Sequence, residues 1–465
     1  MTVHSSTASA RRISYDPSAV QRYQLANGLR VWIEPRPESE SITALLVVRV
    51  GSRYETPANN GISHFVEHMV FDGTEKWPTE EAVADAITHR GGNWNGWTDE
   101  ETTTYFVQLA QRDFDLALDW LSQIVFHPTF PADKVDKERD IIFEEKFGRY
   151  GWLLNTLNAL GLGYELDREI RRALFPGSTL SLRIIGEDAS LDKITRQSLL
   201  DYYHAHYSPA NSALIIVGQM DRAAVREKID QYFGPLPGRA ALPIGAERAD
   251  QPLPQRGPHH VTVRGPFFTD QSVIDIGMRT VEAAHPDRWP LEVLAEVMEE
   301  DLMKEIRYRR GLTYGLSAFS QQFDDVGYFG IVTQVESSKR AEVQRAIEQY
   351  FERVRRGEIT AAQVVNARTA LIGRWALEME DGTRRAAWLA EWAFESGDQP
   401  IPDYAAALQA VTVADLQHMI ETYYTLVRRY AGLHHPIVTV PRGARLLGMI
   451  VGLGGLLWLW RKLQR

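Results

Sequence analysis

The stretch GPLPGRAALPIGAERADQPLPQRGP, residues 234–258, divides this 465-residue chain into two parts. It holds six prolines and four glycines, and so many residues of these types do not fit inside a helix or a central strand. We therefore interpret residues 234–258 as a linker between a first domain, residues 13–233, and a second domain, residues 259–430. The chain length agrees with this division, because about 150 residues per domain predicts two or three domains.

The two parts are related in sequence. Thr195 and Thr412 each precede an amphipathic segment, and apolar and aromatic residues follow both threonines at the same offsets. Both threonines are therefore predicted helix N-caps. Each part also opens with two strand-like stretches before its helix-rich segments. These stretches are residues 29–35, 43–50, 260–263 and 272–278. Strands mixed with longer helices, without a regular alternation, predict a duplicated pair of α+β domains.

The composition limits the kinds of function. Hydrophobic residues make up 44% and charged residues 24% of the chain, which is typical of a globular protein and not of a disordered chain or a coiled coil. With 51 Lys+Arg against 61 Asp+Glu, the net charge is -10, so we expect no nucleic-acid partner. The absence of cysteine excludes disulfides, thiolate metal ligands and cysteine nucleophiles. Any bound metal must therefore be held by histidine and carboxylate side chains.

The sequence His64-Phe65-Val66-Glu67-His68 is the clearest candidate for chemistry. On a helix, His68 lies about 40° from His64 on one side and Glu67 about 60° on the other, so the three share one face. Two imidazoles one turn apart suit zinc, and a carboxylate beside them that is not a ligand can take a proton from water. The alternative is a helix with two partly exposed histidines, which such a short motif alone does not exclude.

A catalytic zinc site needs a third protein ligand. Residues 133–150 form a predicted amphipathic helix in which Glu138 and Glu145 are seven positions apart. The two carboxylates lie about 20° from each other around the helix and can address the same site. One is expected to be the ligand, and the other a group that orients the site. The alternative is a solvated charged helix face.

With these residues, the chain resembles the M16 family (pitrilysin, insulinase and mitochondrial processing peptidase), whose inverzincin signature is H-x-x-E-H. The resemblance covers about residues 20–430 and includes further residues of the family pattern. Among these are Gly61, Asp72, Gly73, Gly92, Glu101, Gly186, Asn211 and Gly218. It implies a duplicated fold of the LuxS/MPP-like metallohydrolase type, one Zn²⁺ per chain, Glu145 as the third ligand and Glu138 as its supporting carboxylate.

The resemblance also implies how a substrate is bound. Arg307 and Tyr314 match an arginine and a tyrosine that reach the substrate from the second domain of family members. The substrate itself is expected to add a strand to an exposed sheet edge, which we place at Thr102–Leu109. The residues expected to contact that added strand are Asn95, Thr98, Thr103 and Tyr105.

These implications define the expected function. The chain is expected to be a metalloendopeptidase that cleaves unfolded peptides, with Glu67 as the general base. The family works as a chamber of four such domains, so the two domains here imply a homodimer, or a heterodimer with another M16 chain. The alternative is a non-catalytic M16-like scaffold that binds peptides or assembles a complex.

The C-terminal segment, residues 442–465, is unlike the rest of the chain. Leu446–Trp460 holds fifteen residues without a charge, between flanking arginines. We interpret this run as a hydrophobic helix that anchors the chain in a membrane, the alternative being a helix docked on the protein or on a second subunit. The first residues have no apolar core of the kind that a secretory signal needs. The expected location is therefore the cytoplasm or a membrane surface.

Overall fold

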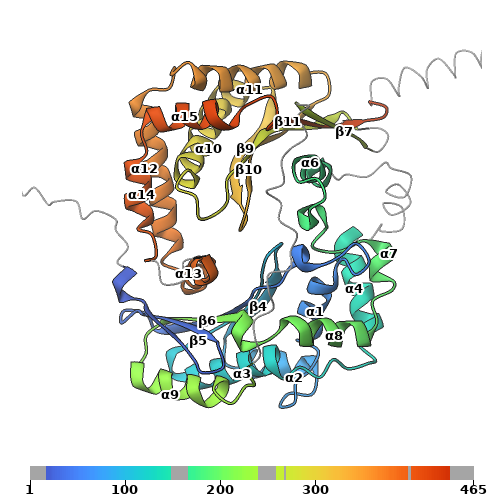
Figure 1. The fold of residues 1–465 in the computed structure, drawn as a ribbon, viewed down its shortest axis with the longest axis vertical. Coiled ribbons are helices and arrows are strands. Elements are labelled where there is room, and N and C mark those ends of the chain that lie inside the picture. Colours follow the sequence, from blue (N-terminus) through green and yellow to red (C-terminus); the bar gives the residue numbers. More distant parts are fainter. Residues whose placement is uncertain (1–16, 148–165, 239–257, 266–268, 396–399, 440–465) are drawn as a thin grey trace, which may run out of the picture.

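The computed structural model describes residues 17–147, 166–238, 258–265, 269–395 and 400–439. These residues form two domains, each built on one sheet with helices packed against it (Figure 1). The predicted two-domain fold of mixed helices and strands is confirmed. The hydrophobic run at residues 446–460 lies outside the described residues. Within the described ranges, no helix has both the length and the apolar character needed to cross a membrane.

The first domain contains a six-stranded sheet with the order β1-β2-β6-β3-β5-β4. Its strands are β1 (Gln21–Gln24), β2 (Arg30–Pro35), β3 (Ser41–Val48), β4 (Asn93–Thr98), β5 (Thr103–Ala110) and β6 (Ser212–Gly218). Neighbouring strands are antiparallel except β2 and β6, which are parallel. The helices of this part of the chain are α1 (Ile62–Met69), α2 (Glu80–Thr88), α3 (Phe114–Phe126), α4 (Val135–Phe147), α6 (Leu166–Leu174), α7 (Asp188–Leu191), α8 (Arg196–His206) and α9 (Arg222–Phe233).

The second domain contains a five-stranded sheet with the order β7-β11-β8-β10-β9. Its strands are β7 (His259–Gly265), β8 (Gln271–Thr280), β9 (Thr313–Gln322), β10 (Gly327–Glu336) and β11 (Arg429–Pro436). The helices are α10 (Arg288–Leu302), the π-helical turn η7 (Met303–Arg309), α11 (Arg340–Arg355), α12 (Ala361–Glu378), α13 (Gly382–Glu395), α14 (Tyr404–Ala410) and α15 (Val413–Tyr423). Short 3-10 turns in the first part are η1 (Pro17–Ala19), η2 (Ser52–Tyr54), η3 (Gln111–Asp113), η5 (Thr179–Ser181) and η6 (Pro209–Asn211).

The two sheets have the same topology. If β2 to β6 are matched with β7 to β11, both sheets run in the same order, and each has one parallel pair, β2–β6 or β7–β11. Thr195 and Thr412 cap the helices that precede the matching strands β6 and β11, each in a capping box, as predicted. The sheet of the second domain continues to Pro436 in β11, six residues beyond the boundary expected at residue 430.

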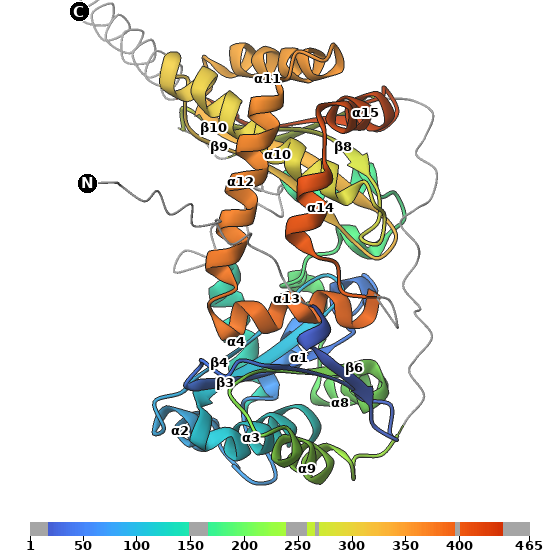
Figure 2. The same ribbon diagram turned by 90° about the vertical axis from the view of Figure 1, so that its left-hand side faces the viewer.

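Each half of the chain contributes one helix that packs on the sheet of the other domain. Helix α13, from the second half of the chain, packs on β3 and β6 of the first sheet (Figures 1 and 2). Helix α6, from the first half, packs in return on β7 and β11 of the second sheet. In β6, Ile215 therefore belongs to a core shared with α13, whereas Leu214 and Ile216 pack against the helices of their own domain. Both faces of the first sheet are buried, and one apolar core runs between the domains.

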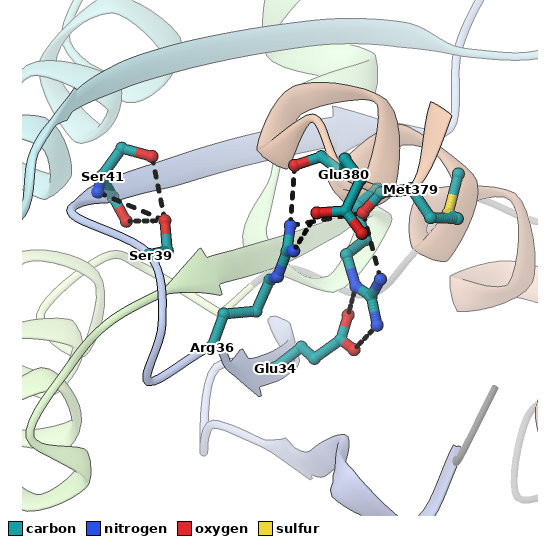
Figure 3. A network of polar contacts seen from close by, with 7 residues as sticks. Glu34, Arg36, Ser39, Ser41, Met379 and Glu380 are labelled. Carbon is teal, nitrogen blue, oxygen red and sulfur yellow. Dashed lines mark hydrogen bonds and ion pairs between the residues drawn. The ribbon is translucent and has the colours of Figure 1, made fainter. Parts of the chain in front are cut away.

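A polar contact fixes the corner between α12 and α13 on the first domain (Figure 3). The Arg385 guanidinium bonds both oxygens of Glu34, with Nε 2.7 Å from Oε2. Glu34 is 3% exposed, so the arginine supplies the counter-charge that a buried carboxylate needs. Arg36 donates to the backbone oxygen of Glu380 at 2.9 Å and pairs with its exposed carboxylate.

Candidate metal centre

Helix α1 presents the two predicted imidazoles on one side. Its apolar residues Ile62, Phe65, Val66 and Met69 are buried in the core of the first domain. The helical repeat then turns His64 and His68 away from that core, with ring centroids 4.6 Å apart. Burial and the neighbouring imidazole lower the pKa of one ring, that of His64, to about 3. This ring is therefore neutral near pH 7, as a metal ligand must be.

The predicted third ligand comes from α4. Oε2 of Glu145 lies 3.6 Å from Nε2 of His64 and 3.6 Å from Nε2 of His68. A tetrahedral ion with bonds of about 2.0–2.1 Å keeps its donor atoms about 3.3 Å apart. Both distances to Glu145 are close to this value, and two imidazoles with one carboxylate are a donor set that zinc accepts. His64, His68 and Glu145 are the residues that would hold the metal.

Glu67 lies beside this donor set. Its Oε2 is 3.8 Å from Nε2 of His64, and it accepts a hydrogen bond of 3.3 Å from Oγ1 of Thr98 on β4. Burial raises the pKa of Glu67 to about 7, although the neighbouring His68 acts in the opposite direction. Such a carboxyl group can both accept and return a proton near neutral pH.

Glu138 lies about two turns before Glu145 on α4 and contacts the other side of the His68 ring. Its Oε2 lies 3.2 Å from Nδ1 of His68, the ring nitrogen that faces away from Glu145. Burial lowers the pKa of His68, but the hydrogen bond to Glu138 and the nearby carboxylates outweigh it and raise the pKa overall. Behind Glu138 lie the carboxylates of Asp72 and Glu80. The ammonium of Lys134 bridges these two, at 3.1 and 2.8 Å, and supplies their counter-charge.

The start of α1 is held by a residue that the sequence analysis missed. The buried carboxylate of Glu55 accepts hydrogen bonds from the backbone N–H groups of Gly61, at 2.7 Å, and Ser63, at 2.8 Å. These N–H groups have no partner within the helix, so a carboxylate there stabilises its N-terminus. Gly61 has φ +94°, and a Cβ on it would lie 2.7 Å from Cα of Gly186. The sequence signal for Glu55 was its position six residues before Gly61, the glycine that precedes the helix.

The strand beside the metal residues is not the one predicted. The stretch Thr102–Leu109 was expected at the sheet edge, but β5 pairs with β3 on one side and with β4 on the other. This prediction is wrong, because the outer position is taken by β4, which holds Asn95 and Thr98. Thr103 and Tyr105 lie in β5 and are buried. Thr98 donates a hydrogen bond to Glu67, so the edge strand is in direct contact with the helix that carries the two histidines.

Arg307 and Tyr314 lie together in the second domain. The Arg307 guanidinium is 5.4 Å from the ring centroid of Tyr314, whose side chain is at the start of β9 and is 89% exposed. Arg307 also lies over the ring of Tyr308, at 5.5 Å. Within the described part of the chain, neither residue of the pair contacts the metal cluster of the same chain. Their role at the substrate stays a prediction.

The chain is similar to known peptidases. Residues 30–147, which include His64, Glu67, His68, Glu138 and Glu145, match the profile described as "Insulinase (Peptidase family M16)". Residues 193–371 match the profile "Peptidase M16 inactive domain".

Individual relatives match most of the chain. An uncharacterized zinc protease of Mycobacterium tuberculosis is 28% identical over 436 residues, which are 90% of this chain and 94% of that protein. An uncharacterized zinc protease of Bacillus subtilis, YmxG, is 25% identical over 365 residues, 78% of this chain and 85% of that protein. The crystal structure of a protease from Helicobacter pylori shares the fold with a TM-score of 0.81, at 19% identity over 90% of this chain and 99% of that one.

Proposed function

This chain belongs to the M16 (insulinase) family of peptidases, and from that premise we propose that it is a zinc-dependent endopeptidase that cleaves unfolded peptides. The observation that carries the proposal is the convergence of three donor atoms. Nε2 of His64 and Nε2 of His68 each lie 3.6 Å from Oε2 of Glu145. Relatives that cover most of this chain are named zinc proteases, which supports zinc as the metal.

The side chains around the metal position have separate tasks in this proposal. A bound zinc ion supplies a Lewis acid that polarises the scissile carbonyl and makes water more acidic. The carboxylate of Glu67 takes the proton from the attacking water and delivers it to the leaving amine. Thr98 holds one oxygen of that carboxylate through its hydroxyl. Glu138 orients the ring of His68 through Nδ1, as carboxylates behind metal-binding histidines do.

The substrate is proposed to pair with β4. This strand, Asn93–Thr98, is at the edge of its sheet and has one paired side, toward β5. An extended peptide can add a strand there through main-chain hydrogen bonds, which favours unfolded chains of varied sequence. Pairing at this edge brings the peptide beside Thr98 and Glu67.

The complete enzyme is proposed to be a dimer that encloses the peptide. The family resemblance implies four domains per chamber, and this chain supplies two. Tyr314 is 89% exposed beside Arg307, so its hydroxyl is available to a substrate enclosed by the second domain. There it donates a hydrogen bond to the oxyanion that forms as the carbonyl is attacked, and Arg307 holds a substrate carbonyl oxygen. A heterodimer with another M16 chain is the alternative assembly.

The test compares cleavage with metal binding. The full chain is incubated with a quenched fluorescent peptide library, with and without a chelator, and its zinc content is measured. We expect chelator-sensitive cleavage by the wild type, and loss of cleavage with retained zinc in the Glu67→Gln variant. Cleavage that survives Glu67→Gln would contradict the mechanism. A wild type that binds zinc and peptides but never cleaves them would support a non-catalytic scaffold instead.

A further inference from the structure

A cavity of about 290 Å³ lies between α10, α12, α13 and α14 (Figure 2). Each of these four helices supplies at least one aromatic ring to the lining, and four of the chain's 12 tryptophans are among the rings. The five aromatic side chains of the lining are Trp289, Trp375, Trp388, Trp392 and Tyr404. No residue of the metal centre lines this cavity, so the mechanism proposed above makes no use of it.

The five rings contact one another in a closed cycle. Trp289 is followed by Trp392, Trp388, Trp375 and Tyr404, whose ring then meets Trp289 again. The centroids of successive rings lie 5.3–6.4 Å apart. On α13, Trp388 and Trp392 are one helical turn apart and therefore share a face of that helix. The rings from four helices thus form one continuous aromatic lining.

The ring planes of this lining have three roughly perpendicular orientations. Trp289 and Trp392 are nearly parallel, at 27°, and so are Trp375 and Tyr404, at 25°. The two pairs meet at 78°, the angle between Trp289 and Tyr404. Trp388 stands at 69° to Trp392 and at 71° to Trp375. Ring faces with three orientations suit a compact, roughly spherical group better than a flat ligand.

The charged side chains of the cavity favour a cation. The lining holds three carboxylates and two guanidinium groups, those of Glu292, Glu378, Glu391, Arg288 and Arg374. Arg374 pairs with Glu296, which lies outside the lining, so the charge of this arginine is already balanced. Glu378 and Glu391 are exposed, whereas four of the five rings are buried. A cation from solvent therefore meets negative charge before it reaches the aromatic faces.

One cation of the chain already uses two of these rings. The Arg288 guanidinium lies 4.8 Å from the ring centroid of Trp289 and 4.6 Å from that of Trp392. It also donates to the backbone oxygen of Ala283 at 2.9 Å. Cations bind ring faces within about 6 Å of the centroid because the faces carry the negative part of the ring quadrupole. The cavity of about 290 Å³ remains beside this arginine.

We propose that this cavity binds an organic cation with a methylated ammonium group, such as trimethylammonium. An ammonium with N–H groups needs hydrogen-bond acceptors when it leaves water, and ring faces are poor acceptors. Methyl groups on the nitrogen need no such partner and leave the positive charge in contact with the rings. Glu378 and Glu391 add a favourable charge at the entrance. The site is independent of peptide cleavage, because none of its residues takes part in the proposed mechanism.

The test compares two ligands of the same shape. Choline carries a trimethylammonium group, and its uncharged isostere dimethylbutanol has a tert-butyl group in the same place. Each compound is titrated into the full chain, and binding is followed by tryptophan fluorescence and by calorimetry. We expect choline to bind at least about tenfold more tightly, because several ring faces contact the desolvated charge. A peptide that bears trimethyl-lysine is titrated in parallel, and the tighter ligand shows whether the cation is a free molecule or a modified side chain.

Variants of the lining locate the binding site. Glu391→Gln changes an exposed side chain, so the fold should persist, and choline affinity should fall about threefold, the size of an exposed charge interaction. Trp388→Leu should abolish the preference for choline, and Trp388→Phe, which keeps a ring, should retain most of it. Glu421→Gln, an exposed charge on α15, is the matched control and should bind as the wild type does. Equal binding of the two compounds by the wild type, no binding of either, or wild-type choline affinity in Glu391→Gln overturns the proposal.

Discussion

Nδ1 of His68 lies 3.2 Å from Oε2 of Glu138, although 70 residues separate the two in the sequence. The contact joins α1 to α4, and Glu138 is 5% exposed, so water does not replace it easily. It fixes the ring of His68 with Nε2 toward Glu145. The metal position therefore depends on a carboxylate that is not itself a ligand.

Glu138→Gln is expected to lower zinc affinity about tenfold to 100-fold, because carboxylates behind metal-binding histidines have effects of this size. The glutamine keeps the shape of the side chain and loses its charge. Affinity is measured by competition with a chromogenic chelator. Glu144→Gln, an exposed position on the same helix, is the control. Equal affinities of the two variants would show that Glu138 does not support the metal.

Thr98→Val is expected to lower kcat about tenfold and to leave the zinc content unchanged. Valine has nearly the same shape as threonine, but it cannot donate to Oε2 of Glu67, a bond of 3.3 Å. A lost hydrogen bond to a charged group is worth about 1.5–3 kcal/mol when the group stays buried. Steady-state kinetics and metal analysis check this. Thr88→Val, on the exposed end of α2, should behave like the wild type.

Removal of the metal is expected to destabilise the fold. The three proposed ligands come from two helices, so the ion binds the folded chain much more tightly than the unfolded one. A ligand at 100 times its Kd stabilises the bound state by about 2.7 kcal/mol. Thermal unfolding with and without chelator should show a lower Tm without metal in the wild type and in Glu67→Gln. His64→Ala should show no shift, and a shift of wild-type size in that variant would argue against His64 as a ligand.

Arg385 and Arg36 are expected to differ in their effect on stability. Arg385→Met leaves the carboxylate of Glu34 buried without a counter-charge, which costs about 3–5 kcal/mol. Arg36→Met removes an ion pair whose acidic partner, Glu380, has a side chain that is 79% exposed, and such pairs contribute about 0–1 kcal/mol. It also removes the hydrogen bond to the backbone oxygen of Glu380, which adds about 0.5–1.5 kcal/mol. Chemical denaturation measures the free energy of unfolding of both variants. The double variant Arg385→Met/Glu34→Gln should recover part of the loss, and no recovery would mean that packing, not charge, explains it.

Asp275 is expected to make stability depend on pH. Burial raises its pKa in the folded state to about 7, against an ordinary value of 3.8. Between these values the folded chain holds a proton that the unfolded chain has lost, so stability falls as the pH rises from about 4 to 7 and then levels off. At pH 8 the ionised, buried group costs on the order of 2–4 kcal/mol.

Asp275→Asn tests this directly. The variant should be more stable than the wild type at pH 8 and close to it at pH 4, as measured by urea unfolding at both values. Tyr430, which donates to Oδ1 of Asp275 at 2.8 Å, can donate to the amide oxygen in the same way. Asp201→Asn is the control for the loss of an exposed charge. A difference from the wild type that is the same at both pH values would contradict the prediction.

Much of the metal centre could be predicted because its geometry is local. The spacing of His64, Glu67 and His68 puts them on one face of any helix, and the seven-residue spacing of Glu138 and Glu145 does the same. The structure adds that the two faces meet, with Glu138 and Glu145 on opposite sides of the ring of His68. That meeting depends on how α1 and α4 pack, which no spacing within either helix determines.

The strand prediction failed for the same kind of reason. The β-branched and aromatic residues of Thr103–Ala110 are typical of a strand, but they do not say which strands lie on either side. Strand order follows from pairings between distant segments, and these place β3 and β4 around β5. The edge position, and with it the proposed substrate strand, therefore belongs to β4.

The sequence by itself determined the class of site, the helix faces that carry its residues and the presence of two related domains, because helix periodicity and helix caps act within short segments. Only the tertiary structure decided the edge strand and the exchange of α6 and α13 between the domains. Each of these depends on contacts between segments far apart in the chain. Their free energy comes from packing and charge pairing in three dimensions, which local sequence patterns do not encode.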